Sequence, residues 1–325
     1  MSGGPGPVRI GVVGVGHLGR HHARLLASTP GARLVGVADV APNRAATVAA
    51  EYGTEAFDHH SALLANVDAV SIAVPTVDHF SVARDFLAAG VHVLVEKPMT
   101  ATLAEAEALL ALAESAGCRL AVGHTERFNP AVAAAIPLIS APRFIEVHRL
   151  SGFPERSLDI DVVFDVMIHD LDIVLAIDRS ECLRVDAVGV PVLSRRVDLA
   201  NARLKFASGC IVNLTASRIS RDRVRKVRFF ERDAYVGVDY GEQEVEAYRI
   251  VPGSGERPAI GGGAVPVEKG ESLGRELRDF VDAIREGRPP LVTGQDGYRA
   301  LVLATRVATA IAADDGGDGA AAPAG

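Results

Sequence analysis

Residues Val8–Gly19 read VRIGVVGVGHLG, and this stretch decides the fold of the N-terminal part of the chain. A run of β-branched residues leads straight into a GxGxxG pattern formed by Gly14, Gly16 and Gly19, and a helix-length segment follows. At such a turn the first glycine permits a tight bend, the second lets the backbone approach a pyrophosphate, and the third packs the helix against the sheet. The pattern alone is weak in a chain with 32 glycines, but its place between a predicted strand and a predicted helix is specific.

Short apolar runs alternate with helix-length segments as far as residue 125. The runs RLVGVAD, DAVSIAV, VHVLVE and RLAVG have the continuous apolar character of parallel strands that are buried on both faces. Segments such as PNRAATVAAEYG and TLAEAEALLALAESAG lie between them. This alternation predicts an α/β protein whose residues 1–125 form a doubly wound (Rossmann) parallel sheet.

Asp39 stands at the end of the second predicted strand, 20 residues after Gly19. A carboxylate at this point accepts hydrogen bonds from an adenosine ribose and repels a 2′-phosphate. We therefore expect NAD as the cofactor, with its pyrophosphate over Gly14–Leu18, a stretch that includes His17. Arg44 is close enough in sequence to leave NADP possible. The alternative is a glycine-rich turn that binds no ligand.

Two later loops also follow predicted strands, and ligands of such sheets bind beyond the carboxyl ends of the strands. One loop reads VPTVDH and the other EKP. A lysine at a strand end, followed by a proline, is placed to point into the cleft; the alternative is a surface lysine before a helix. The cofactor contacts that we predict in these loops are Val74, Pro75, Thr76, His79, Glu96 and Lys97.

The stretch Asp161–Val174, DVVFDVMIHDLDIV, sets ionisable residues among apolar ones. At helical spacing Asp165 and His169 share a face, and Asp172 lies one turn further on. A metal site is one possibility, but no HxH or HExxH spacing supports it, and we predict no metal. A structural core histidine is another. Because an imidazole titrates near neutrality, the Asp165–His169 pair favours an acid/base role.

Residues 126–313 are predicted to form a second α/β domain. Longer runs such as FIEVHRLSG and ARLKFASGCIVNLTASR alternate in polarity, which is typical of a large, mostly antiparallel sheet. The glycine-rich segment from Gly253 to Gly263 is predicted to be a loop, and helices are expected near 272–286 and 295–312. Residues 314–325 are of low complexity and are expected to form a disordered tail.

The composition disfavours several classes of protein. A net charge of −7 disfavours nucleic acid and anionic membranes as partners. Cys118, Cys182 and Cys210 form no CxxC pair, as expected in a reducing compartment. The chain has no 18-residue apolar run and no signal-peptide pattern at MSGGPGP. We expect a cytoplasmic protein.

Together these motifs resemble the glucose–fructose oxidoreductase / inositol dehydrogenase (Gfo/Idh/MocA) family. The resemblance covers almost the whole chain: the glycine turn with Asp39, the VPTVDH loop, EKP at 96–98, the VGHTERFNP run that ends at Pro130, and the Asp165-xxx-His169 helix. Each piece is common, but their ordered combination is specific. The family's usual glycine before the histidine is Ile168 here, so the backbone there is open to a different packing.

The resemblance implies an NAD-dependent oxidation of a sugar secondary hydroxyl. His169 takes the hydroxyl proton, and Asp165 orients the substrate or the imidazole. Lys97 either hydrogen-bonds the same oxygen and stabilises its charge or shares the proton relay. It also implies a cis Lys97–Pro98 peptide, and we expect a homodimer or homotetramer that assembles through the C-terminal sheet.

Three runs, VGHTERFNPAV, DVMIHDLDIV and LTASRISRDRVRKVRFF, are similar to those of a nucleotide-sugar subgroup of the family. The narrower expectation is oxidation of the 3-hydroxyl of UDP-N-acetylglucosamine, with Arg127 and Asn129 at the substrate or, alternatively, packing the domain junction. The rival functions are an inositol or other free-sugar dehydrogenase and a non-catalytic NAD-dependent sensor.

A basic stretch interrupts the acidic chain. Strand alternation puts Arg221, Arg223 and Arg225 on one face. This face is either a solvated or subunit-facing surface, as charge runs usually are, or a docking surface for an anionic substrate such as a nucleotide diphosphate sugar. The full stretch comprises Arg218, Arg221, Arg223, Arg225, Lys226 and Arg228.

Overall fold

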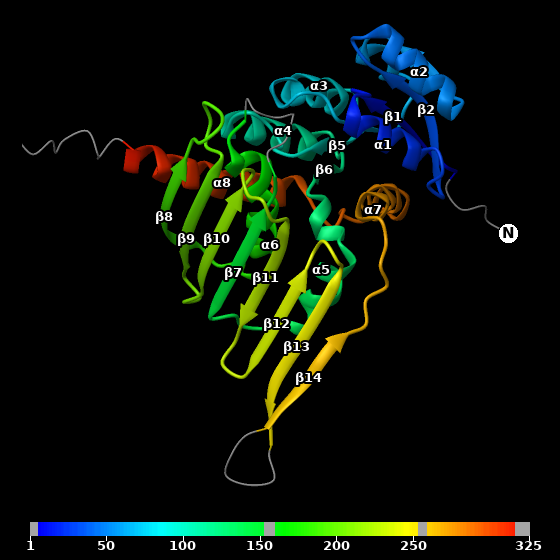
Figure 1. Ribbon diagram of the computed structural model, residues 1–325. Helices are drawn as coiled ribbons and strands as arrows, with labels where there is room; N and C mark the ends of the chain where they lie inside the picture. Colours follow the sequence, from blue (N-terminus) through cyan, green and yellow to red (C-terminus); the bar gives the residue numbers. More distant parts are fainter. Residues whose placement is uncertain (1–5, 153–159, 253–258, 316–325) are drawn as a thin grey trace, which may run out of the picture. The chain divides into compact units, whose positions relative to one another are not determined.

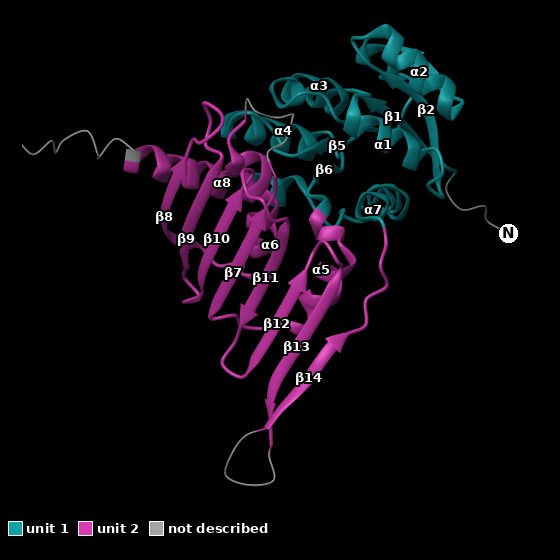
Figure 2. Ribbon diagram, in the orientation of Figure 1, with its two compact units in different colours: residues 1–125, 271–298 teal, residues 126–270, 299–325 magenta. Residues whose placement is uncertain are grey.

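The structure, a computed structural model, describes residues 6–152, 160–252 and 259–315. The chain divides into two compact units, coloured separately in Figure 2. Unit 1 comprises residues 1–125 and 271–298, and unit 2 comprises residues 126–270 and 299–325. The sequence predicts one domain over residues 126–313. Residues 271–298 instead belong to unit 1, because their helix packs its apolar face on the N-terminal sheet.

Unit 1 contains a six-stranded parallel sheet in the order β3-β2-β1-β4-β5-β6. The strand order reverses at β1, which pairs with β2 on one side and β4 on the other. This is the predicted doubly wound sheet, and the prediction is confirmed. The strands are β1 (Val8–Val13), β2 (Ala32–Ala38), β3 (Glu55–Phe57), β4 (Ala69–Ile72), β5 (His92–Glu96) and β6 (Leu120–Gly123).

The helices of unit 1 follow the predicted segments. The helix at 103–115 begins with the capping box of Thr102 and Glu105, in which each side chain accepts from the other residue's backbone N–H. A single apolar cluster joins β1 and β2 to three of the helices. The helices are α1 (His17–Leu26), α2 (Pro42–Tyr52), α3 (Thr76–Ala88), α4 (Leu103–Ser115) and α7 (Ser272–Glu286).

Unit 2 is built on an eight-stranded sheet in the order β14-β13-β12-β11-β7-β10-β9-β8. Every neighbouring pair is antiparallel except β7 and β10, so the predicted mostly antiparallel sheet is confirmed. The strands are β7 (Phe144–Leu150), β8 (Cys182–Val190), β9 (Leu199–Phe206), β10 (Ile211–Ser217), β11 (Val224–Phe230), β12 (Ala234–Asp239), β13 (Glu244–Val251) and β14 (Ala259–Val265).

Helices cover one face of this sheet, and we call the other the open face (Figure 1). Alternate residues of each strand pack under the helices, as Val227 and Phe229 of β11 do, while Lys226 and Arg228 point to the open face. The covering helices are α5 (Pro130–Ala135), α6 (Ile168–Ile177) and the part of α8 (Gly294–Asp315) that belongs to unit 2.

Two segments differ from the sequence expectation. β14 begins at Ala259 inside the predicted loop that runs from Gly253 to Gly263, and residues 253–258 lie outside the described residues. α8 extends to Asp315, so the start of the predicted tail is helical, while residues 316–325 lie outside the described residues. Over the part of the chain that is described, no helix is both long enough and apolar enough to cross a membrane.

Candidate active site

The glycine turn after β1 has the geometry that a pyrophosphate requires. Gly14 has φ +81°, a left-handed conformation that suits glycine. A Cβ on Gly19 would lie 1.8 Å from the Gly14 carbonyl oxygen, so only glycine lets α1 start this close to the turn. A Cβ on Gly16 would meet no atom within 4 Å. His17 and Leu18 are exposed in the first turn of α1, which carries no acidic residue. This N-terminus therefore suits an anion.

Asp39 is held at the carboxyl end of β2 by three groups. Its oxygens accept from the backbone N–H groups of Val15 and Ala41, each at 2.9 Å. The Arg44 guanidinium lies 3.3 Å from both oxygens and is about half exposed. Asp39 thus ties its strand to the glycine turn, beside a cation that could meet a 2′-phosphate. Its contact with a ribose stays a prediction.

His79 joins the two predicted cofactor loops. Its side chain is buried, with Nδ1 2.9 Å from the Pro98 carbonyl oxygen and Nε2 3.0 Å from the Val74 carbonyl oxygen. Burial lowers the pKa of His79 below its ordinary value, so near neutral pH the ring is uncharged and donates to one carbonyl at a time. These contacts give His79 a role in holding the loops, whereas Pro75 is exposed and Val74 and Thr76 are half-buried beside it.

Lys97 is half-buried just after β5, and its peptide bond to Pro98 is cis, as predicted. The preceding Glu96 is buried, and one of its oxygens accepts from the Lys97 backbone N–H at 3.2 Å. Its other oxygen lies 3.1 Å from Nε2 of the buried His22, at ion-pair distance but not aligned as a hydrogen bond. The Nδ1 atom of His22 is 2.7 Å from the Ser71 hydroxyl.

The contacts of His22 with Ser71 and Glu96 support the end of β5, just before Lys97. The sequence did not predict a role for His22, because its two partners lie on other elements: His22 is on α1, Ser71 on β4 and Glu96 on β5. A sequence signal did exist: a histidine on the apolar side of α1, which must find a partner once it is buried.

Asp165 and His169 lie on consecutive helical segments of unit 2, and both are half-buried. The sequence predicted one α-helix through this stretch. The structure has a π-helical turn, Val163–Met167, that contains Asp165 and runs into α6, whose second residue is His169. Such turns are frequent at functional sites because the wider turn re-aims side chains. Lys97 belongs to unit 1, and Asp165 and His169 belong to unit 2.

The polar residues around α6 form buried ion pairs that sequence reasoning did not find. Arg149 of β7 binds both oxygens of Asp170, at 2.7 and 2.8 Å, and donates to Glu126 at 2.8 Å. Its guanidinium also lies over the Tyr240 ring, 4.9 Å from the centroid. Asp170 directly follows His169, so this anchor fixes the part of α6 that carries the predicted base.

Arg127 and Asn129, predicted at the substrate, have contacts within unit 2. Arg127 is buried and lies 3.2 Å from the Asp172 carboxylate on α6. Asn129 caps α5 by accepting from the Ala131 N–H, and its amide donates to Glu126 and to the Tyr240 carbonyl oxygen. These contacts account for both side chains without a substrate, and their substrate role stays a prediction.

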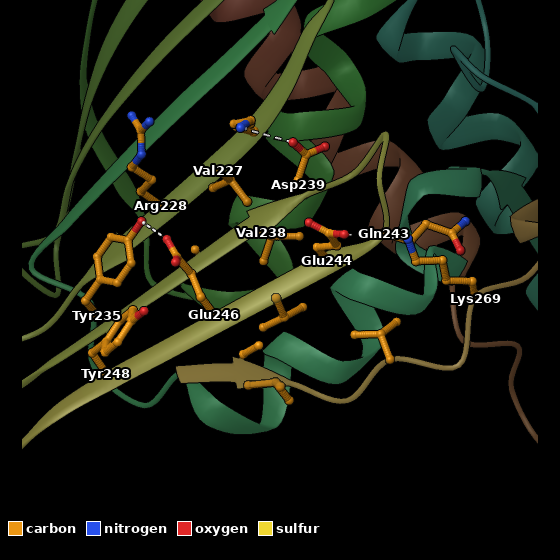
Figure 3. A pocket seen from close by; sticks show the side chains of 16 residues that line it. Val227, Arg228, Tyr235, Val238, Asp239, Gln243, Glu244, Glu246, Tyr248 and Lys269 are labelled. Carbon is orange, nitrogen blue, oxygen red and sulfur yellow. Dashed lines mark hydrogen bonds and ion pairs between the residues drawn. The ribbon is translucent and has the colours of Figure 1, made fainter. Parts of the chain in front are cut away.

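A hollow of about 540 Å³ lies over β11–β14 of unit 2 (Figure 3). Its open-face side chains pair with one another, Lys226 with Asp239 at 3.2 Å and Tyr235 with Glu246 at 3.0 Å. The charges at this hollow are therefore largely compensated. It lies on the open face of the sheet, opposite the face that α6 covers, so it is separate from the predicted base. Across the described ranges no cluster of His, Cys, Asp and Glu is suited to hold a metal ion.

The chain is similar to a known protein family and to several characterised enzymes. A family model described as an oxidoreductase family with an NAD-binding Rossmann fold, Gfo/Idh/MocA, matches residues 8–124. The UDP-N-acetylglucosamine 3-dehydrogenase of Acidithiobacillus ferrooxidans is 43% identical over 310 residues, which cover 94% of this chain and 98% of that protein. Its solved structure superposes with a TM-score of 0.88 at 42% identity and the same coverage.

Two other known proteins are less similar. The scyllo-inositol 2-dehydrogenase (NAD(+)) of Bacillus subtilis is 30% identical over 317 residues, which cover 89% of this chain and 90% of that protein. A levoglucosan dehydrogenase, solved in complex with NADH and levoglucosan, has a TM-score of 0.85 at 19% identity over 94% of this chain and 98% of that one, which shows a shared fold. The identity along nearly the whole length establishes that this chain belongs to the Gfo/Idh/MocA family of NAD-dependent oxidoreductases.

Proposed function

We propose that the chain oxidises the 3-hydroxyl of UDP-N-acetylglucosamine to a 3-keto sugar, with NAD as the hydride acceptor. The observation that carries this proposal is the 43% identity, over 94% of the chain, to an enzyme with that activity. The glycine turn supports the cofactor part of the proposal. Its open space at Gly16 and the N-terminus of α1 suit a pyrophosphate.

The residues of this chain would divide the chemistry as follows. When bound, NAD supplies the acceptor for the hydride that leaves the sugar carbon. His169 takes the proton from the hydroxyl oxygen, because an imidazole titrates close to neutral pH. Lys97 donates a hydrogen bond to the same oxygen and stabilises its developing negative charge. Asp165 orients the substrate or the imidazole. The Arg149–Asp170 ion pair holds α6 in place during this step.

The test is NADH formation by the purified protein with UDP-N-acetylglucosamine, N-acetylglucosamine and myo-inositol as separate substrates. We expect turnover of the UDP-linked sugar and little turnover of the other two, since the remote UDP group helps to position the reacting carbon. Equal turnover of N-acetylglucosamine and its UDP-linked form would contradict the nucleotide-sugar assignment. Absence of turnover with every sugar would favour the non-catalytic sensor.

An inositol or other free-sugar dehydrogenase is the second candidate, because a scyllo-inositol 2-dehydrogenase is 30% identical over most of the chain. Activity on myo-inositol alone would establish it. We also propose a cytoplasmic homodimer or homotetramer that assembles through the open face of the unit 2 sheet. Exposed Tyr248, Ile250 and Ile260 on that face support the interface, and three cysteines that form no disulfide support the compartment.

A further inference from the structure

The basic stretch at 218–228 does not act as one surface. Arg218 is buried and binds Asp198 at 2.8 Å, and the same carboxylate accepts from the backbone N–H groups of residues 192–194. Lys226 and Arg228 point to the open face and pair with Asp239 and Glu146. Arg221, Arg223 and Arg225 remain, and none of them forms an ion pair with a residue that the structure describes.

Arg225 differs from the other two because it is partly buried, whereas Arg221 and Arg223 are exposed. In the β7–β11 register it lies directly opposite Arg149. Side chains directly opposite on antiparallel strands are in contact range, and like charges in that position repel. The nearby carboxylates give Arg225 little relief, because Arg149 already binds Asp170 and Glu126.

Arg225 is thus a partly desolvated cation that lies near two other cations, Arg149 and Arg223. Burial lowers the pKa of Arg225, and so do the charges of Arg149 and Arg223, which outweigh the opposing effect of Glu126 and Asp170. A guanidinium in this setting is unfavourable unless an anion joins it. Arg225 therefore has the character of a cation that is held ready for a ligand rather than one that stabilises the fold.

The position of Arg225 connects it to the predicted base. Strand alternation places Arg225 on the same face of the sheet as Arg149, the face that α6 covers. Arg149 contacts Asp170, which directly follows His169 on α6. The partly buried cation is thus one side chain away from the helix that carries the predicted base.

We propose that Arg225, together with Arg223, binds the diphosphate group of the nucleotide-sugar substrate. This inference rests on the proposed function and adds to it the residues that select the substrate class. A guanidinium presents paired N–H donors that match two phosphate oxygens. The diphosphate would supply negative charge to Arg223 and Arg225, neither of which forms an ion pair with a described residue. Inositols and free sugars are neutral, so they would bring no counter-charge to Arg223 and Arg225. Arg225 is therefore a specificity-determining residue.

The experiment compares Arg225→Met with Arg228→Met in the full-length protein. The two residues lie on the same strand, and the control removes the same chemical group from the open face, the side of the sheet that α6 does not cover. UDP is the probe, titrated calorimetrically. We expect UDP affinity to fall about tenfold or more in Arg225→Met, as for the loss of a charge-assisted hydrogen bond, and to stay within about twofold in Arg228→Met.

Thermal unfolding without ligand separates a binding role from a structural one. Removing a cation that has no ion pair among the described residues should leave the Tm unchanged or raise it. UDP should raise the Tm of wild type and Arg228→Met by more than that of Arg225→Met. A fall of several degrees in unliganded Arg225→Met would overturn the inference, because Arg225 would then stabilise the fold. Unchanged UDP affinity in that variant would overturn it as well.

Steady-state kinetics distinguish failure of this inference from failure of the proposed function. We expect the KM for UDP-N-acetylglucosamine to rise about tenfold or more in Arg225→Met. If wild type oxidises this sugar and Arg225→Met has the same KM, the diphosphate site is wrong and the proposed function stands. If wild type binds UDP through Arg225 but oxidises no nucleotide sugar, the proposed function is wrong and the anion site stands.

Discussion

Alanine substitutions at Gly16 and Gly19 should separate cofactor binding from folding. The two glycines belong to one turn, yet their surroundings differ. A Cβ on Gly16 would enter open space, and Gly16 has φ −65°, which any residue adopts. A Cβ on Gly19 would lie 1.8 Å from the Gly14 carbonyl oxygen, which is a backbone atom. The same added methyl group should therefore have opposite consequences at the two positions.

The magnitudes follow from these contacts. Gly19→Ala requires the start of α1 to move away from the turn by more than about 1 Å, and overpacking of this size costs about 3 kcal/mol or more. Its Tm should fall by several degrees. Gly16→Ala should leave the Tm unchanged, but its methyl group occupies the space into which the pyrophosphate must come. Losing one or two backbone hydrogen bonds to the phosphates would weaken NAD binding about ten- to a hundredfold.

Thermal unfolding and fluorescence titration with NADH measure the two effects on the same samples. If Gly16→Ala binds NADH as tightly as wild type, the pyrophosphate does not approach Gly16 and the cofactor assignment of this turn is refuted. If Gly16→Ala loses as much stability as Gly19→Ala, the space at Gly16 is not open in solution.

Three further predictions concern catalysis, cofactor choice and stability. Lys97→Ala and His169→Ala should each lower kcat more than about tenfold without weakening NADH binding. If His169→Ala keeps more than about a tenth of the wild-type kcat, His169 is not the base. Asp39→Ser should weaken NAD binding and strengthen NADP binding in parallel titrations, and equal wild-type affinity for both would contradict the role of Asp39. Asp198→Asn should lower the free energy of unfolding by about 3–5 kcal/mol near pH 7, because buried Arg218 loses its counter-charge. Hydrogen bonds hold the Asp198 pKa below its ordinary value of 3.8, so the stabilisation by Asp198 is present above pH 3.8 and is lost as the pH falls below it. Urea unfolding of wild type and Asp198→Asn measures this. A stability difference between them that does not shrink in acid would argue against the ion pair.

The parallel sheet of unit 1 was predictable because its strands are buried on both faces and therefore read as continuous apolar runs. β3 was missed, since its three residues are too few to show a period. β14 was predicted to be a loop because AIGGGAV is glycine-rich. A Cβ on Gly262 would lie 2.0 Å from the Ala247 carbonyl oxygen, so the close approach of β13 requires the glycine that hid the strand.

The site was predictable only where a motif is local. The glycine turn, EKP and Asp165-xxx-His169 are each contiguous in sequence. The partners of His22 and Arg149 are distant along the chain, and no local pattern marks them. The π-helical turn was also missed, because apolar spacing over five residues does not distinguish a π-turn from an α-turn.

The discontinuity of unit 1 bears on how the chain is made. Leu277, Phe280 and Val281 of α7 are almost fully buried in the cluster that includes β1. Burial of three such side chains contributes roughly 5–9 kcal/mol, which is comparable to the whole stability of a typical domain. A ribosome that has released residues 1–125 has thus not yet supplied a complete nucleotide-binding core. We expect the N-terminal unit to gain its full stability only after α7 has emerged, and a fragment that ends at residue 125 to aggregate through the apolar patch that α7 normally covers.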